Sequence, residues 1–516
     1  MLLAVEPRAP GAISAKSNCD SSTLSIIPEE EYTGMSAKLA NLYIVFILIL
    51  SWTVAVRADL AQRIDSIVEK QKGVHYSIHV IKADSGTTVY DHRANDLMIP
   101  ASNMKVVTTA AALRYLGADF EYKTKVGLCD STLMVVGSGD PLLGDPRLDE
   151  KYERETGWIF ADIAAKLKAK RITSVNDIIV DTTIFDDERV HSAWPEDQLN
   201  RWYEAEVSGL NYNDNCIDII AEKINGMVSV SLRPSTNFVT LLNKIKPTSA
   251  GPSAVAAYRN KQPNKLTLTG DVSKKATLAD IAIERPAGFF GFLLAEHLAA
   301  KGIRAKGHLL EKELEVRDNC DLLAVYTTSM ADCLMRCNKN SLGLVAEALL
   351  KTIAAHSSPA KKNGSWAKGR ELVGAFLMEL GLDESQFYVD DGSGLSRQNE
   401  LAARTLTTVL RHLYKSSNWD LYRDSLSVGG IDGTLEKHFR EGKYKGRIRG
   451  KTGYITGVKS LSGICETDRG EYIFCILGNN GPSRSAINSI AQAIIDEYEV
   501  EAPKSTEPNL PDSNDS

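Results

Sequence analysis

The sequence predicts an α/β protein into which a large region of mostly β structure is inserted. Strand-like alternation of apolar and polar residues occurs near both ends of the chain. Helical patterns with one apolar stripe accompany these strands and return after residue 316. Between residues 126 and 315, short β-like runs alternate with Gly, Asp and Pro. We therefore predict one domain formed by residues 59–125 and 316–500, with an inserted region at 126–315.

The first part of this domain is predicted to contain a helix, a hairpin and a second helix. Leu60 and Ile64 belong to one apolar stripe within residues 59–73. Residues 76–83 and 87–91 are strand-like and flank a turn with the sequence Asp-Ser-Gly, which is typical of a hairpin. An Ala-rich helix follows Pro100 and ends before Gly117.

The second part is predicted to be helical first and to end as β, β and α. Helices are expected at 344–351, 366–380 and 402–414, and strands at 447–455, 459–466 and 471–477. Ser483 is expected to cap the last helix. Within the inserted region, residues 159–167 are helical in pattern, whereas 175–181 and 227–232 are strand-like.

The two chain ends differ in composition from the rest. Lys38, the apolar run 42–50, and small residues at Val56 and Ala58 indicate a signal peptide within residues 1–58, with Met35 a more natural start than Met1. If uncleaved, this leader would associate the chain with a membrane, although the run is short for a spanning helix. We therefore expect a periplasmic or otherwise extracytoplasmic protein. Residues 501–516, rich in Pro, Ser and Asp, are expected to be a disordered tail.

Composition excludes several function classes. The net charge is −6, which argues against a nucleic-acid-binding protein. The eight cysteines are irregularly spaced, and removal of the leader with Cys19 leaves an odd number, so no disulfide framework is indicated. Cys333 and Cys337 are not followed by a second pair at zinc-site spacing. We expect no metal and no cofactor.

Three short motifs carry the predicted chemistry. Ser102 and Lys105 lie three residues apart at a helix start, so they share one helix face. Ser341-Leu342-Gly343 and Lys451-Thr452-Gly453 follow in that order. Motifs of the Ser-x-x-Lys and Lys-Thr-Gly type occur together in class A β-lactamases and penicillin-binding proteins.

Each residue of these motifs has an expected role. Ser102 is the nucleophile, Lys105 its base, and Ser341 a proton relay to the leaving amine. Lys451 and Thr452 are expected to bind a substrate carboxylate, and Gly453 to let substrate approach the strand edge. The backbone N–H groups of Ser102 and Tyr454 are candidates for an oxyanion hole.

The flanking segments resemble one family in particular. Gly139-Asp140-Pro141, the run from Asp391 to Ser396, the run from Gly430 to Leu435, and residues 450–463 are similar to the class C low-molecular-mass penicillin-binding proteins. These are D-alanyl-D-alanine carboxypeptidase/endopeptidases of the penicillin-binding protein 4 type. The resemblance covers residues 60–498. It implies a serine transpeptidase/β-lactamase-like domain: an antiparallel sheet with covering helices and a helical subdomain.

The resemblance also implies a function. The expected reaction is hydrolysis of the D-Ala-D-Ala bond of peptidoglycan stem peptides through an acyl-enzyme on Ser102, with β-lactams acylating the same serine. Asp140 is expected to face the cleft and to bind an amine of the substrate. The family usually has Asn where this chain has Gly343, a position expected to contact substrate. A catalytically silent peptidoglycan-binding homologue, or a β-lactamase, are the alternatives.

Overall fold

The computed structural model describes residues 60–314 and 320–499. The predicted leader, Cys19 and the predicted tail after residue 500 lie outside the described residues. Within the described ranges, no helix has the length and apolar character needed to cross a membrane.

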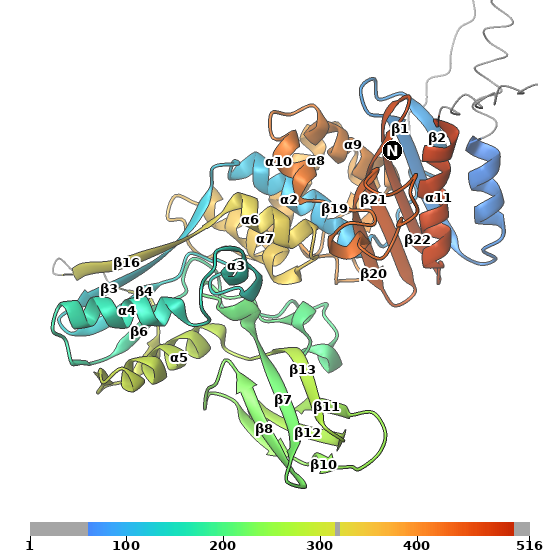
Figure 1. Cartoon of the computed structure of the whole chain (residues 1–516). Helices are drawn as coiled ribbons and strands as arrows, with labels where there is room; N and C mark the ends of the chain where they lie inside the picture. Colours follow the sequence, from blue (N-terminus) through green and yellow to red (C-terminus); the bar gives the residue numbers. More distant parts are fainter. Residues whose placement is uncertain (1–59, 315–319, 500–516) are drawn as a thin grey trace, which may run out of the picture. The chain divides into compact units, whose positions relative to one another are not determined.

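Both ends of the chain contribute strands to one six-stranded sheet (Figure 1). Its order is β19-β20-β21-β22-β1-β2, and every pair is antiparallel. The strands are β1 (His75–Lys82), β2 (Thr88–His92), β19 (Ser427–Val428), β20 (Ile448–Ile455), β21 (Val458–Thr467) and β22 (Gly470–Asn479). β1 pairs with β22 over its whole length, so the predicted N-terminal and C-terminal hairpins form one sheet.

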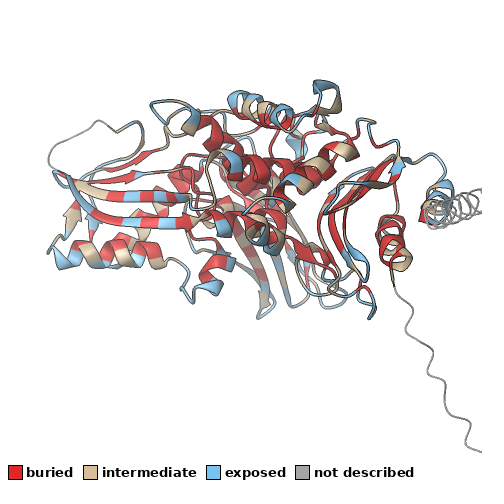
Figure 2. Cartoon of the chain, turned by 90° about the horizontal axis from the view of Figure 1, so that it is seen from above, coloured by how far each residue is buried: buried red, intermediate tan, exposed pale blue. Residues whose placement is uncertain are grey.

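Alternate residues of this sheet enter two separate cores. In β22, Ile473, Cys475 and Leu477 pack with the helical subdomain. Phe474 and Ile476 instead pack with the helix over residues 60–69 and with α11 (Arg484–Glu497) on the other face. The sheet is thus covered on both sides, and Figure 2 shows its strands buried along most of their length. Because successive strand residues point to opposite faces, the near-continuous apolar run of β22 follows from burial on both sides.

The helical subdomain lies against one face of the sheet. Its helices are α2 (Met104–Tyr115), α6 (Met330–Asn338), α7 (Gly343–Ser357), α8 (Trp366–Glu379), α9 (Ala403–Tyr414) and α10 (Trp419–Ser425). Nearly every residue of α2 is buried, and its Ala-rich sequence suits a helix surrounded by α7, α8 and α9. Ser329 and Ser483 cap α6 and α11 through their side chains, the latter as predicted.

The inserted region contains a mixed α/β layer and a smaller β part. The layer is a five-stranded sheet in the order β15-β6-β4-β3-β16, covered by two helices. Its elements are β3 (Glu121–Cys129), β4 (Thr132–Val136), α4 (Trp158–Ala169), β6 (Ile178–Asp181), α5 (Pro286–Ala300), β15 (Leu309–Glu311) and β16 (Cys320–Ser329). The sheet therefore begins before residue 126 and ends after 315.

The remaining insert elements are short or form two small sheets. Strands β13-β7-β8 form one sheet, and β9, β10, β11 and β12 form the other. Their bounds are β7 (Cys216–Ile224), β8 (Met227–Arg233), β9 (Thr240–Asn243), β10 (Lys246–Pro247), β11 (Ala254–Arg259), β12 (Lys265–Val272) and β13 (Lys275–Ala282). The short elements of the insert are α3 (Pro146–Lys151), β5 (Ser174–Val175) and β14 (Arg304–Ala305), whereas β17 (Phe387–Tyr388) and β18 (Glu400–Leu401) lie outside it and pair with each other.

One disulfide joins the two strands that enter and leave the inserted region. Cys129 ends β3 and Cys320 begins β16, and they are Cα partners in the ladder between these strands. The cysteine spacing gave no sign of this bridge, because its two ends are 191 residues apart in sequence. The other cysteines of the described ranges are free and buried.

Candidate active site

Ser102 lies in a tight turn that leads directly into α2. Residues Ala101–Asn103 form a 3-10 helix, and α2 begins at Met104. Ala101 has a φ of 48°, a conformation that is costly for a residue with a side chain. The turn is fixed from the sheet: Asn103 Nδ2 donates to Ser460 Oγ at 2.6 Å, and Ser462 donates to Asn103 Oδ1. The position of Ser102 is thus held by β21.

Lys105 faces Ser102 from the first turn of α2. Its Nζ donates to Ser102 Oγ at 3.1 Å and to the backbone oxygen of Ser393 at 2.8 Å. The side chain is almost fully buried. Burial lowers the pKa of the Lys105 amine below its usual value, which favours the neutral form that a general base requires.

A second serine and lysine face each other on the opposite side of the same site. Lys451 Nζ donates to Ser341 Oγ at 2.8 Å and to the Thr452 backbone oxygen at 2.6 Å. Burial, together with the nearby charge of Lys105, lowers the pKa of Lys451 well below its usual range. Ser341 has a φ of 61°, so a second strained residue stands at this site.

Strand β20 forms one wall and leaves part of its edge open. β19 pairs with it only at Gly450 and Arg449, so the residues from Thr452 onward have a partner on the β21 side alone. Thr452 Oγ1 donates to Thr434 Oγ1 at 2.8 Å, and both threonines line the cavity together with Tyr454. Such an open edge can pair with an extended peptide.

Gly453 is glycine for a different reason from the one predicted. A Cβ at this position would lie 2.1 Å from Ser460 Oγ and 2.8 Å from the Pro100 backbone oxygen. Its missing side chain therefore makes room for the turn that carries Ser102, and Gly453 does not itself line the cavity. Lys451 is also fully buried behind the cavity wall.

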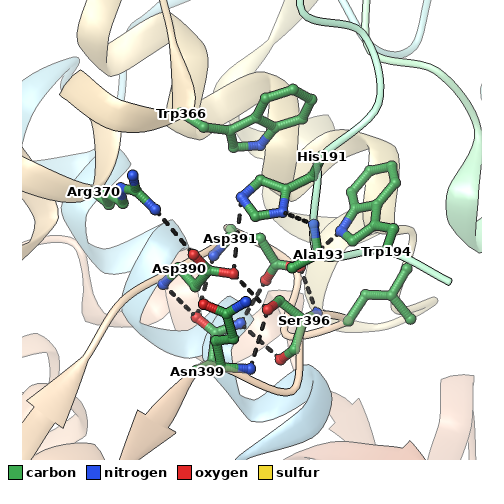
Figure 3. A network of polar contacts seen from close by, with 12 residues as sticks. His191, Ala193, Trp194, Trp366, Arg370, Asp390, Asp391, Ser396 and Asn399 are labelled. Carbon is green, nitrogen blue, oxygen red and sulfur yellow. Dashed lines mark hydrogen bonds and ion pairs between the residues drawn. The ribbon is translucent and has the colours of Figure 1, made fainter.

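The loop at residues 390–399 supplies the backbone oxygen that Lys105 uses. Two buried carboxylates hold it: Asp391, which Figure 3 shows, and Glu347. Asp391 accepts from the backbone N–H groups of Gly394 and Ser396, both at 2.7 Å. Glu347, on α7, accepts from the N–H of Ser393 at 2.7 Å. Burial raises the pKa of Glu347 to about 7.

The inserted region also holds this loop. Trp194 Nε1 donates to Asp391 Oδ2 at 3.0 Å, and His191 Nε2 lies 3.9 Å from Asp390 Oδ2. Figure 3 shows both rings reaching from the inserted chain toward the paired aspartates, with Arg370 on the other side of Asp390. Arg370 Nη1 donates to Asp390 Oδ1 at 2.9 Å.

The residues enclose a cavity of about 730 Å³. Ser102, Lys105, Ser341, Gly343, Thr452 and Tyr454 all line it. Among the described residues, none with a carboxylate side chain lines this cavity, and no group of acidic, His or Cys residues is arranged to hold a metal ion.

The structure corrects the prediction that Asp140 faces the cleft. Its side chain is buried away from the cavity, and its two oxygens accept from the Leu142 N–H at 2.9 Å and from Thr328 Oγ1 at 2.7 Å. Burial raises the pKa of Asp140 to about 6. The Gly-Asp-Pro sequence therefore forms a packed turn, and its carboxylate is occupied within the protein.

Comparison with known proteins decides the family. The model of the D-Ala-D-Ala carboxypeptidase 3 (S13) family matches residues 60–499 of this chain. The chain belongs to the S13 family. It is therefore a serine hydrolase of the D-Ala-D-Ala carboxypeptidase class, as the motifs predicted.

Individual relatives agree with this S13 assignment. A D-alanyl-D-alanine carboxypeptidase of Actinomadura sp. strain R39 is 29% identical, over 85% of each chain. The D-alanyl-D-alanine carboxypeptidase DacB of Haemophilus influenzae is 23% identical, over 78% of this chain and 84% of the relative. The crystal structure of penicillin binding protein 4 from the same organism matches with a TM-score of 0.70 at 20% identity, over 85% and 99% of the two chains. The predicted fold class is confirmed.

One wall of the S13 site was missed from sequence. Ala193, Pro195, Gln198, Trp202 and Tyr203 line the cavity, and all belong to the inserted region. The concentration of aromatic residues in 194–203 is the one sequence feature that could have indicated this wall. In the folded chain, Trp202 is still 37% exposed. Arg397 and Gln398, within the 390–399 loop, and Thr434 also line the cavity and had no predicted role.

Proposed function

We propose that this S13 enzyme removes the terminal D-alanine from peptidoglycan stem peptides through an acyl-enzyme on Ser102. The observation that supports this most strongly is the pair of serine–lysine contacts around one cavity, Lys105 with Ser102 and Lys451 with Ser341. A nucleophile, a buried base with a lowered pKa and a second proton-transfer serine around one cavity suit acyl transfer.

The reaction follows from these contacts. Ser102 Oγ attacks the carbonyl carbon of the scissile bond while Lys105 Nζ takes its proton. The N–H groups of Ser102 and Tyr454 stabilise the oxyanion. The carbon–nitrogen bond then breaks, and the proton that Lys105 took passes through Ser341 to the leaving D-alanine amine, so Lys105 is neutral again. Water then attacks the ester carbonyl carbon while Lys105 takes its proton. The ester bond breaks, that proton passes to Ser102 Oγ, and the shortened peptide leaves.

The substrate carboxylate is placed beside β20. Thr452 and Thr434 present hydroxyl groups to the cavity, and the Lys451 amine lies behind them. An extended peptide on the open edge of β20 would bring its terminal carboxylate to these hydroxyls. A cross-linked peptide differs only in a larger leaving group, so we extend the proposal to endopeptidase cleavage.

We further propose that the protein works outside the cytoplasm. Its substrate belongs to the cell wall, and the Cys129–Cys320 disulfide is of a kind that persists in oxidising compartments. The predicted leader supports the same location.

The two alternatives are less favoured. A class A β-lactamase hydrolyses its acyl-enzyme with a carboxylate acting through water, whereas no described residue with a carboxylate lines this cavity. Gly343 favours a silent homologue, but it removes neither serine–lysine pair.

The test is release of D-alanine from an acylated peptide that ends in D-Ala-D-Ala. We expect steady release, none from the L-Ala-L-Ala peptide, and none by the Ser102→Ala variant. Nitrocefin should acylate the protein with slow turnover. Rapid nitrocefin turnover without D-alanine release would indicate a β-lactamase, and absence of both reactions would indicate a silent homologue.

A further inference from the structure

Asn340 lies on the loop between α6 and α7, one residue before Ser341, and lines the cavity. The orientation of its carboxamide follows from its contact with Arg336. Arg336 Nη1 donates to Asn340 Oδ1 at 2.9 Å. Since a guanidinium has donors and no acceptor, the carboxamide must present its oxygen to Arg336. Its amino group then faces the other way, and Nδ2 has no hydrogen-bond partner among the described residues.

The inserted region prevents Arg336 from moving. Arg336 Nε donates to Asp145 Oδ2 at 2.7 Å, and Nη2 lies 3.0 Å from Asp214 Oδ2. The arginine is 5% exposed, and Asp145 is itself fixed because its other oxygen accepts from the Leu148 N–H at 2.8 Å. A buried charged network of this kind holds its members in one geometry. The Asn340 amide is thus oriented before any substrate arrives.

Position 343 provides no competing side-chain donor. Gly343 begins α7 and lines the same cavity. A Cβ there would meet nothing closer than the Tyr203 backbone oxygen at 3.4 Å and Ser393 Cβ at 3.7 Å. The glycine is therefore not required by lack of space, and the carboxamide on this side of the cavity comes from Asn340, next to the Ser341 hydroxyl.

A peptide on the edge of β20 needs a donor on its far side. Alternate carbonyls of an extended chain point in opposite directions, so one set faces β20 and the other faces away from it. The Ser341 loop meets β20 across the site, with Lys451 Nζ 2.8 Å from Ser341 Oγ. Resting on the function proposed above, we propose that Asn340 Nδ2 donates to the acylamino carbonyl of the substrate, the carbonyl that precedes the acylated residue.

Acylation rates with two penicillins distinguish substrate binding by Asn340 from a purely structural role of this residue. Benzylpenicillin carries an acylamino carbonyl, and 6-aminopenicillanic acid lacks it. Asn340→Ala should lower the second-order acylation rate with benzylpenicillin by about 3- to 10-fold, the value of one neutral hydrogen bond, and should lower the 6-aminopenicillanic acid rate less. Asn340→Asp keeps an acceptor for Arg336 but has no donor, and should lose at least as much with benzylpenicillin.

A rescue variant and a neighbour complete the experiment. Gly343→Asn should restore part of the benzylpenicillin rate in the Asn340→Ala background, because the Cβ position has room. Lys339→Ala is the matched control: its Nζ pairs with Asp432 at 2.7 Å and it does not line the cavity, so it should keep the ratio of the two rates. An Asn340→Ala variant with an unchanged benzylpenicillin rate, or with equal losses for both penicillins, would overturn the inference. If the unmodified chain reacts with neither penicillin, the proposed function itself fails first.

Discussion

The two serine–lysine pairs of this site look alike but are built differently. Lys105 and Ser102 are neighbours on one turn of chain, 3.1 Å apart between Nζ and Oγ. Lys451 and Ser341 are 110 residues apart in sequence and meet at 2.8 Å only because β20 packs beside the α6–α7 loop. Burial lowers the pKa of both amines, and for Lys451 the positive charge that Lys105 carries when protonated lowers it further.

The difference assigns distinct tasks to the two pairs. Only Lys105 contacts Ser102 and the Ser393 oxygen, so it is placed to take the nucleophile's proton. Lys451 contacts Ser341 and its own strand, so we propose that it acts on the side of the leaving group and the carboxylate. The account therefore predicts unequal effects when each pair is broken.

The largest effect is expected from Lys105→Ala. Loss of the base should remove measurable acylation by penicillin, because Ser102 would keep its proton. Stopped-flow or labelling with a fluorescent penicillin measures this. Lys368→Ala, which changes an exposed lysine paired with Glu371, is the control and should react at the normal rate. Normal labelling of Lys105→Ala would mean that Lys451 serves as the base.

Ser341→Ala should slow the reaction without abolishing it. Removal of one proton-transfer group is expected to cost about 10²- to 10⁴-fold in rate. The loss should be greater for peptides than for β-lactams, since the D-alanine amine must be protonated as it leaves, whereas the β-lactam ring is strained. Comparing kcat for the peptide with the penicillin acylation rate checks this. A loss as complete as that of Lys105→Ala for both substrates would contradict the separation of tasks.

Part of this comparison could be predicted from sequence and part could not. The Ser102–Lys105 pair and the strands β1, β2, β21 and β22 depend on local spacing and alternation, which a sequence displays directly. The order of the motifs assigned Ser341 and Lys451 to one site, but their contact with each other was not predicted. The Asp140 prediction was wrong because a Gly-Asp-Pro turn does not reveal whether its carboxylate faces a cavity or a backbone N–H.

The contribution of the inserted region was not predictable from local patterns. Its wall at Ala193–Tyr203 and the Trp194 contact to Asp391 depend on how a distant segment packs. The same holds for Glu347, which lies in an ordinary helical pattern but accepts from the loop N–H groups of Gly392 and Ser393. Long-range hydrogen bonds of this kind are a property of the folded chain.

Glu347→Gln should slow acylation indirectly, by disturbing the loop oxygen that Lys105 contacts. The glutamine NH₂ group would face a backbone N–H from which the Glu347 carboxylate accepts a hydrogen bond, so the Ser393 backbone oxygen would shift. We expect an acylation rate about 10-fold lower, the scale of one disturbed hydrogen bond. Because the Glu347 charge raises the pKa of Lys105, its removal should move the midpoint of the pH–rate profile to lower pH. The rate rises with pH through this midpoint, since neutral Lys105 is the active form.

The matched control is Glu379→Gln, on an exposed carboxylate paired with Arg114. It should leave both the plateau and the midpoint of the profile unchanged. A Glu347→Gln variant with the same plateau and midpoint would show that this carboxylate does not position the base.

The smallest effect on acylation is expected from opening the disulfide. Neither Cys129 nor Cys320 lines the cavity, so a Cys129→Ser/Cys320→Ser double variant should acylate at the normal rate at 25 °C. Its stability should fall by about 2–4 kcal/mol, because the bridge closes a long loop in the unfolded chain. Denaturant unfolding with and without a reductant measures this. Reduced acylation with unchanged stability would link the bridge to the site instead.

The most direct test is the identity of the residue that penicillin modifies. The contact of Ser102 with Lys105 and its place in a strained turn predict that Ser102 is the nucleophile. Mass spectrometry of the proteolysed adduct should find the penicilloyl group on Ser102 alone, and Ser102→Ala should fold normally and carry no adduct. An adduct on Ser341, Ser393 or Ser396, or persistent labelling of Ser102→Ala, would contradict the account.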